Sequence, residues 1–180
     1  MTDLRPFVRF LLRDAAVVAL LAAVWWLDVS LRNAAVTGPW SYAVAISAGL
    51  LTTLVGFFCH EWGHLLGTLL ANGVAHAPRR LTSPFLFFFD VATSDRRAFL
   101  IMSLGGYVAS ALALAVIVLT VPWGSLSGLV ALVATTLGVI ATFALEVPTT
   151  IRVARGGPLP NGGVFADETG HPKAADCSER

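Results

Sequence analysis

The sequence is poor in charged residues. Only 13% of its 180 residues are Asp, Glu, Lys or Arg, whereas 56% are hydrophobic. A soluble globular domain has about 25% charged residues, so the composition excludes an ordinary soluble domain and indicates an integral membrane protein surrounded by the lipid bilayer. The net charge of +1 and the lack of a basic cluster give no sign of a nucleic-acid partner.

Cysteine is also scarce. The chain has two cysteines, Cys59 in an apolar run and Cys177 near the C-terminus. Two thiols in such different surroundings do not form a disulfide framework. We therefore expect both to be free.

Long stretches contain no charged residue at all. Positions 33–59 and 98–145 lack Asp, Glu, Lys and Arg, and a transmembrane helix needs about 20 apolar residues. The turn signal Pro122 to Ser125 divides the longer stretch. These runs predict an all-α membrane protein whose single membrane domain covers residues 1–147. Its four transmembrane helices are expected at about 14–31, 41–72, 98–121 and 126–147.

Two polar segments interrupt or follow these helices. The first, residues 74–97, contains the apolar run Phe85 to Phe89 directly after Pro84. Prolines beside aromatic residues favour a short strand or hairpin at the membrane surface between the second and third helices. The second begins at Arg152 and is rich in Gly and Pro before it becomes polar. Residues 164–180 are therefore predicted to be a disordered cytoplasmic tail.

The basic residues predict how the protein is oriented. With the N-terminus in the cytoplasm, Arg32 is the only basic residue that falls outside, and the other eleven of the twelve fall inside. Cytoplasmic loops carry the excess of Lys and Arg. We expect a multi-pass protein of a bacterial inner membrane with both termini in the cytoplasm.

The stretch FFCHEWGHLLG, residues 57–67, places three ionisable residues inside the second predicted helix. His60, Glu61 and His64 fit the pattern H-E-x-x-H. Residues four apart lie on one helix face about 6 Å apart, so both imidazoles can bind one Zn²⁺ while Glu61 approaches a water bound to the metal. One charged residue in a span costs roughly 2.5–3.5 kcal/mol, so three together indicate a function. The pattern predicts metal-assisted hydrolysis with Glu61 as the base.

The depth of this motif follows from the helical rise. His64 lies eight residues before Asn72, the predicted end of the second helix, which corresponds to about 12 Å. With the orientation above, the site lies below the cytoplasmic surface and is reached from the cytoplasm.

The motif and the sequence after it resemble the site-2 protease family of intramembrane zinc metalloproteases. In that family the helix after the zinc helix opens with a basic pair and an A-G-P-x-x-N-like stretch. Here Arg96 and Arg97 precede LGGYVAS, Leu104 to Ser110, which lacks the Pro and the Asn. The stretch is closer to the compact branch of the family. The resemblance covers about residues 41–165, the expected catalytic core.

This resemblance implies an activity and a cofactor. It implies a three-helix core that hydrolyses a peptide bond in a transmembrane or membrane-anchored protein substrate, near the cytoplasmic face. It also implies zinc bound by His60, His64 and a carboxylate from a later D-G motif. The segment after the zinc helix would bind an unwound substrate as an added strand, with Phe85, Phe87 and Phe89 as candidate contacts. Alternatively, these phenylalanines anchor the loop in the membrane interface.

The third ligand departs from the family pattern. Where the family has Pro followed by Asp-Gly, this chain has Pro160 followed by Asn161 and a glycine, and neutral Asn is a weak zinc ligand. Glu146 is the acidic residue of the last two predicted helices, at a depth comparable with that of the histidines. It is the leading candidate, with Asn161 as a substitute and with Asp90 and Asp167 as further candidates.

Two other functions remain open. Some zinc transporters also place H-E-x-x-H in a membrane helix, and a divalent-metal transporter should carry polar residues on several spans. A non-catalytic pseudoprotease that binds and regulates a membrane partner would tolerate the loss of Glu61, and Asn161 supports that alternative.

Overall fold

The computed structural model describes residues 2–160 as a helical protein with one small sheet. Asn161, Asp167 and the predicted tail lie outside the described residues. The fold contains the four expected long helices and the expected hairpin between the second and third. The elements are η1 (Arg5–Phe7), α1 (Val8–Asn33), α2 (Pro39–Leu70), β1 (Ala75–His76), β2 (Phe88–Phe89), α3 (Arg96–Thr120) and α4 (Leu126–Ala154).

Local sequence explains where three of these helices begin. Gly38 adopts φ 136° before Pro39, which is the first residue of α2, and proline is favoured at that position. The side chain of Asp95 accepts a hydrogen bond from the amide of Ala98 at 2.7 Å at the start of α3. Ser125 caps α4 in the same way through the amide of Gly128 at 3.0 Å.

Three of the helices are long and apolar enough to cross a membrane, namely α2, α3 and α4. This finding supports an integral membrane protein. Helix α1 is not among the three, so a crossing by α1 stays a prediction. Its buried carboxylates, Asp14 and Asp28, have polar partners within the protein.

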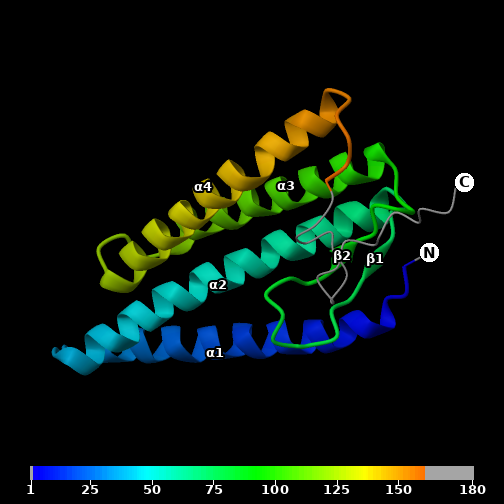
Figure 1. Ribbon diagram of the computed structural model, residues 1–180. Helices are drawn as coiled ribbons and strands as arrows, with labels where there is room; N and C mark the ends of the chain where they lie inside the picture. Colours follow the sequence, from blue (N-terminus) through cyan, green and yellow to red (C-terminus); the bar gives the residue numbers. More distant parts are fainter. Residues whose placement is uncertain (1, 161–180) are drawn as a thin grey trace, which may run out of the picture.

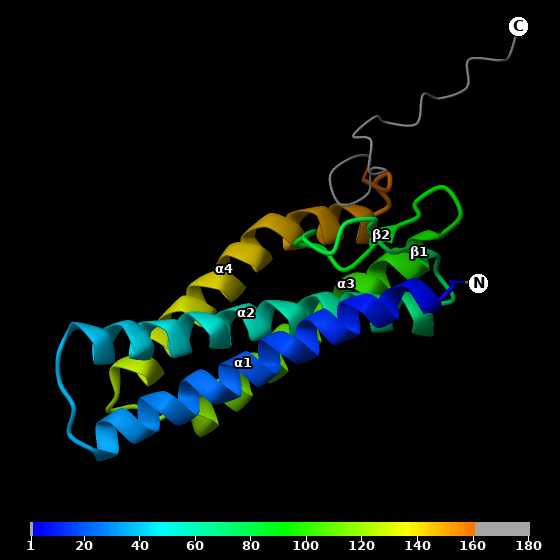
Figure 2. The ribbon, with the colours of Figure 1, turned by 90° about the horizontal axis from the view of Figure 1, so that it is seen from below.

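Helix α2 is the centre of the bundle and packs against α1, α3 and α4. In Figure 1, α1 lies on one side of α2, and α3 and α4 lie on the other. The N-terminal end of α1, the β1–β2 hairpin and the C-terminal end of α4 gather at one end of the bundle. The connections α1–α2 and α3–α4 lie at the opposite end, as Figure 2 also shows.

The hairpin is shorter than the predicted Phe85–Phe89 strand. Its two strands are antiparallel, with Ala75 opposite Phe89 and His76 opposite Phe88. Between His76 and Phe88 the chain forms neither helix nor strand, so the start of the aromatic run belongs to a loop. The loop and hairpin pack on an apolar cluster at this end of the bundle that includes Phe7, Phe10, Leu65, Leu86, Phe87, Phe89, Phe99 and Val153.

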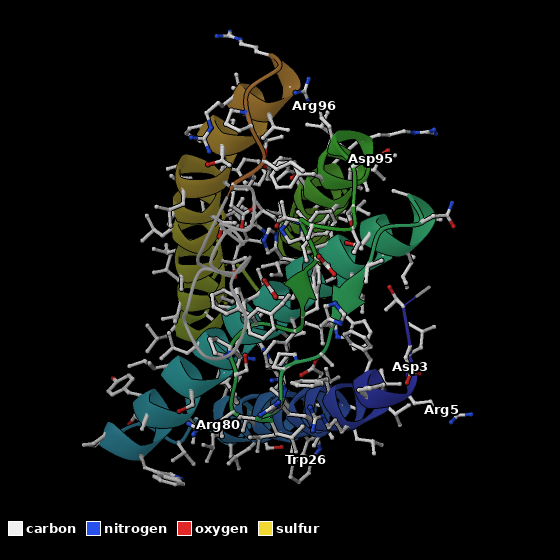
Figure 3. All side chains as sticks on the ribbon, turned by 45° about the vertical axis from the view of Figure 1, so that its right-hand side comes forward. Asp3, Arg5, Trp26, Arg80, Asp95 and Arg96 are labelled. Carbon is white, nitrogen blue, oxygen red and sulfur yellow. The ribbon has the colours of Figure 1, made fainter. Side chains whose placement is uncertain are left out.

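Helix α4 continues beyond its predicted end at residue 147. It includes Pro148 and ends at Ala154. Proline has no amide proton to donate four residues back, yet helices in membranes tolerate it where neighbouring groups satisfy the backbone. Beyond α4, the guanidinium of Arg96 donates to the carbonyl of Gly156 at 2.9 Å and so joins the start of α3 to the end of α4. Figure 3 shows Arg96 beside that end of α4.

The opposite end of the bundle is held by a buried carboxylate. Asp28 of α1 is 2% exposed and accepts hydrogen bonds from Ser127 Oγ at 2.8 Å and from Arg32 Nε at 3.0 Å. A buried charge is tolerated when it is paired and hydrogen-bonded. This contact therefore joins α1 to α4 far from the hairpin.

Candidate metal centre

The H-E-x-x-H residues lie on α2 and face the interior of the bundle. His60, Glu61 and His64 are 3%, 7% and 9% exposed. The helical repeat places the histidines on one face, and their Nε2 atoms are 2.9 Å apart. The expected pairing of the two imidazoles is thus present.

Glu146 of α4 meets both histidines. Its Oε1 lies 3.2 Å from His60 Nε2, and its Oε2 lies 3.3 Å from His64 Nε2. Among residues 2–160, these three side chains form a group that can hold a metal ion, with ligand atoms within 4.8 Å of one another. The structure therefore brings together the histidines and the carboxylate that the sequence suggested.

The other candidate ligands are not part of this group. Asp90 follows β2, and its Oδ2 lies 3.2 Å from His76 Nε2. Its Oδ1 accepts hydrogen bonds from the amides of Ala92 and Thr93. Asp90 is therefore engaged in the hairpin. Asn161 and Asp167 lie beyond the part of the chain that the structure describes.

Helix α3 orients both imidazole rings. His64 Nδ1 lies 2.9 Å from the carbonyl oxygen of Met102, and His60 Nδ1 lies 3.1 Å from the carbonyl of Gly106 and 2.9 Å from Ser110 Oγ. A carbonyl only accepts, so each Nδ1 carries the proton and donates it. In the neutral imidazole, Nε2 then has its lone pair free for a cation, which is the arrangement common among metal-binding histidines.

Glycines let α2 and α3 come this close. A Cβ on Gly63 would lie 2.5 Å from the carbonyl oxygen of Gly105, and a Cβ on Gly105 would lie 2.3 Å from that of Gly63. Gly67 of α2 admits α3 in the same way, since a Cβ there would lie 2.5 Å from the carbonyl oxygen of Ile101. At Gly56 a Cβ would make only an ordinary contact with Thr135, so close approach does not require glycine there.

Gly106 of α3 leaves room for the ring of His64. A Cβ there would lie 2.3–2.6 Å from three ring atoms of His64. Real Cβ atoms do not approach other atoms so closely. The ring of His64 therefore occupies the space that a side chain at position 106 would need.

A backbone amide of the loop after β1 contacts Glu61. Leu86 N donates to Glu61 Oε2 at 2.9 Å. Glu61, His64 and Glu146 also line a cavity of about 150 Å³. Its other walls come from aromatic residues of the loop, from α3 and from α4: Phe85, Phe87, Phe89, Phe99, Met102, Ser103, Leu145, Thr149 and Thr150. The three phenylalanines proposed as substrate contacts thus lie beside the candidate metal group.

A hydrogen bond between α3 and α4 holds the Glu146 side of the site. Tyr107 Oη lies 2.7 Å from Thr150 Oγ1, and Thr150 Oγ1 donates to the backbone carbonyl of Glu146 at 3.2 Å. The ring of Tyr107 also packs edge-on against that of Phe143, with centroids 5.1 Å apart. Glu146 is therefore presented by a turn of α4 that is anchored on α3.

Several contacts of this site were not evident from the sequence. Ser110 and Gly106 belong to the LGGYVAS stretch, but their roles depend on which face of α3 meets α2. The amide of Leu86 carries no signal in the sequence, because every residue except proline has one. The available signal was the pair of adjacent glycines, which marks a helix that another backbone can approach.

Comparisons of the chain with family models, with curated proteins and with solved structures found no match.

Proposed function

We propose that the protein is an intramembrane zinc metalloprotease that hydrolyses a peptide bond in a membrane-embedded or membrane-proximal segment of a protein substrate. The observation that carries this proposal is the meeting of Glu146 with both histidines of H-E-x-x-H, beside a cavity that Glu61 also lines. A ligand set, a base and an adjoining space are the three components that hydrolysis requires.

The donor atoms fit zinc. Ligands at about 2.0–2.2 Å from one zinc ion are separated by less than about 4.4 Å, and the three contacts among His60, His64 and Glu146 are 2.9–3.3 Å. Two imidazoles with one carboxylate form a set that catalytic zinc sites use, with a fourth position left open. When bound, zinc would supply Lewis acidity and make a water more acidic.

Glu61 would move the proton in this reaction. Its Oε2 is held by the amide of Leu86, which fixes the carboxylate beside the cavity. As water adds to the carbonyl carbon of the scissile bond, Glu61 takes the proton that water loses. It then passes this proton to the departing nitrogen as the C–N bond breaks, so the products are a carboxylic acid and an amine.

The hairpin supports the binding of an extended substrate. Within the described residues the sheet has two strands, so β2 has an edge that no strand of residues 2–160 covers. An extended peptide can pair with such an edge. Phe85, Phe87 and Phe89 would then contact substrate side chains at the cavity, whereas a purely interfacial anchor would have no need to line it.

The proposed setting is a bilayer crossed by α1 to α4, with both termini in the cytoplasm. The hairpin lies at the end of the bundle that holds the N-terminus, and His64 and Glu146 of the candidate metal group line a cavity together with Phe89 of β2. Most basic residues are at that end or flank it, and the positive-inside rule assigns it to the cytoplasm. Water would then reach the site from the cytoplasmic side.

The test separates metal binding from proton transfer. Glu61→Gln should retain zinc and lose about 10²- to 10⁴-fold in cleavage rate, since it removes only the base. Glu146→Ala should lose zinc affinity by more than the roughly 10- to 100-fold that follows loss of a residue behind the ligands. Zinc content and cleavage of a transmembrane model peptide are measured on the purified full chain, with Asp3→Asn as the control.

Four outcomes would contradict the proposal. Wild-type protein that carries no zinc after growth with ample metal has no such site. Full cleavage by Glu61→Gln would support a different base, and undiminished partner binding without any cleavage would support a pseudoprotease. Zinc uptake into proteoliposomes would support the transporter instead.

A further inference from the structure

We propose that Arg13 and Asp14 of α1 are positioning residues for Glu61 and act through the loop between the two strands. This inference rests on the proposed function, because it assigns Glu61 as the base. The loop, residues 77–87, is here called the site loop. Helix α1 lies outside the three-helix core that the family resemblance implies, so the resemblance gives α1 no part in the reaction.

The first link joins α1 to the motif helix. Asp14 is buried, with 6% of its surface exposed. Its Oδ2 accepts a hydrogen bond from Trp62 Nε1 at 2.8 Å, and its Oδ1 accepts one from Arg13 Nε at 2.7 Å. Trp62 is the residue directly after Glu61 in H-E-x-x-H. A buried charge therefore fixes the motif helix next to the base and orients Arg13 at the same time.

The second link joins α1 to the site loop. Arg13 Nη1 donates to the carbonyl oxygens of Leu81 at 3.0 Å and of Ser83 at 2.9 Å. Arg9, one turn earlier on α1, donates to the carbonyl of Pro78. The Arg13 guanidinium also lies over the ring of Phe58 on α2, 4.9 Å from its centroid, a favourable cation–π distance. Arg13 is thus held between α1, α2 and the loop.

The third link reaches the base. Ser83 Oγ donates to the carbonyl oxygen of Phe85 at 3.0 Å, and the next amide along the chain, that of Leu86, donates to Glu61 Oε2. Asp14, Arg13, Ser83, Leu86 and Glu61 therefore form one continuous chain of contacts from α1 to the base.

The site loop depends on these contacts because it contains no helix or strand. Few of its backbone groups have partners within the loop, and a segment of this kind opens at low free-energy cost unless side chains hold it. A charge-assisted hydrogen bond is stronger than a neutral one. Arg13 donates two such bonds to the site loop and Arg9 donates one, so Arg13 is the larger attachment of the loop to α1. Without it, the amide of Leu86 would not remain fixed on Glu61.

The experiment uses hydrogen exchange on the full-length, zinc-loaded protein in lipid nanodiscs. In Arg13→Gln, the amides of Ser83 and of residues 85–88 should exchange about tenfold faster or more, the effect expected from losing charge-assisted hydrogen bonds. The zinc content should be unchanged, because Arg13 contacts no candidate ligand. Arg5→Gln is the matched control, since Figure 3 shows Arg5 pointing away from the bundle.

A kinetic readout separates positioning from mere stability. In Arg13→Gln, kcat for cleavage of a transmembrane model peptide should fall about tenfold, with KM changed by less than about twofold, as expected for a displaced catalytic group. A merely structural role would lower zinc content and the folded fraction together. Ser83→Ala, in the middle of the chain of contacts, should raise exchange at Leu86 even if Arg13→Gln does not fold.

Two results would overturn the inference. Exchange at Ser83 and residues 85–88 that is the same in Arg13→Gln, Ser83→Ala and Arg5→Gln would show that the site loop is not held through α1. Faster exchange at these residues with an unchanged kcat would show that the attachment of the site loop to α1 does not position Glu61 for the reaction. If the wild type cleaves nothing, the proposed function fails, whereas the exchange data still test the attachment by themselves.

Discussion

At the scale of single residues, the absence of a side chain at position 106 fixes one imidazole. The His64 ring fills that space, and its Nδ1 reaches the carbonyl of Met102 one turn earlier on α3. The position of the His64 ring in this space determines both its tautomer and the direction in which its Nε2 points. A methyl group at position 106 would collide with the His64 ring, including its Nε2 atom, and would therefore act on metal binding by displacing this imidazole.

Gly106→Ala is expected to lower zinc affinity at least tenfold, in the range reported for residues that support ligands. Overpacking should also reduce the free energy of unfolding by about 1–3 kcal/mol. The control is Gly138→Ala on α4, where a Cβ would meet nothing within 4 Å, and which should stay within about 1 kcal/mol of the wild type. Competition with a fluorescent zinc chelator measures the first effect. Equal affinities in the two variants would contradict the role given to Gly106.

Residues whose function depends on spacing along one helix could be predicted from the sequence. His60, Glu61 and His64 follow from the helical repeat alone, and Glu146 was a candidate because it is the acidic residue of an otherwise uncharged stretch. Ser110 and Gly106 could not be assigned, since their contacts depend on how α3 is rotated against α2. That rotation is set by backbone packing, which single residues do not reveal.

At the scale of elements, a contact between two polar side chains holds the hairpin, which is not part of the helices α2, α3 and α4 that could cross a membrane. His76 on β1 and Asp90 after β2 lie 3.2 Å apart. Partial burial acts to raise the pKa of Asp90, but the hydrogen bonds from His76, Thr93 and Ala92 outweigh it, so the pKa is lowered from its ordinary value. A carboxylate with a lowered pKa stabilises the folded form while it is ionised.

The sign of the pH dependence follows from this shift. The contribution of Asp90 should be fully present above the ordinary pKa of Asp, about 3.9, and should be lost as the pH falls through the lowered value. Because His76 is solvent-exposed, the contribution should not exceed about 1 kcal/mol. Amide exchange in β1 and β2 is compared between the wild type and Asp90→Asn at each pH. A difference that persists or grows at the acidic end would contradict the prediction.

The number and order of elements were also readable from the sequence, but their ends were not. Uncharged runs and the Pro122 turn predicted the long helices, whereas α4 includes Pro148 and continues beyond its predicted end at residue 147. The Phe85–Phe89 strand was too long, because Glu61 and α1 hold the first part of that run as a loop. Tertiary contacts overrode local preference in both cases.

At the scale of the whole molecule, the two ends of the bundle differ. One end carries the N-terminus and the hairpin, and the other carries the connections α1–α2 and α3–α4. If all four helices cross the bilayer, the exposed residues Asp3 and Ala92 share a side and Gly124 faces the opposite one. The side of the membrane on which Asp3 lies therefore tests whether α1 crosses the bilayer.

Single cysteines test this arrangement in a background in which Cys59 and Cys177 are replaced by serine. In intact cells, a membrane-impermeant maleimide should label Gly124→Cys, whereas Asp3→Cys and Ala92→Cys should react only after the membrane is opened. Reaction of Ala92→Cys but not Gly124→Cys would invert the orientation. Labelling of Asp3→Cys together with Gly124→Cys, while Ala92→Cys stays protected, would mean that α1 does not cross.

The proline of α4 has a consequence for how a metal would leave. Both histidines are on α2, whereas Glu146 is on α4 two residues before Pro148, which cannot donate to the carbonyl of Ala144. The two halves of the ligand set thus sit on helices of unequal stiffness. We expect a bound ion to lose the Glu146 carboxylate first and the two imidazoles last. The lifetime of the bound ion would then depend on the bending of α4 rather than on the strength of the nitrogen ligands.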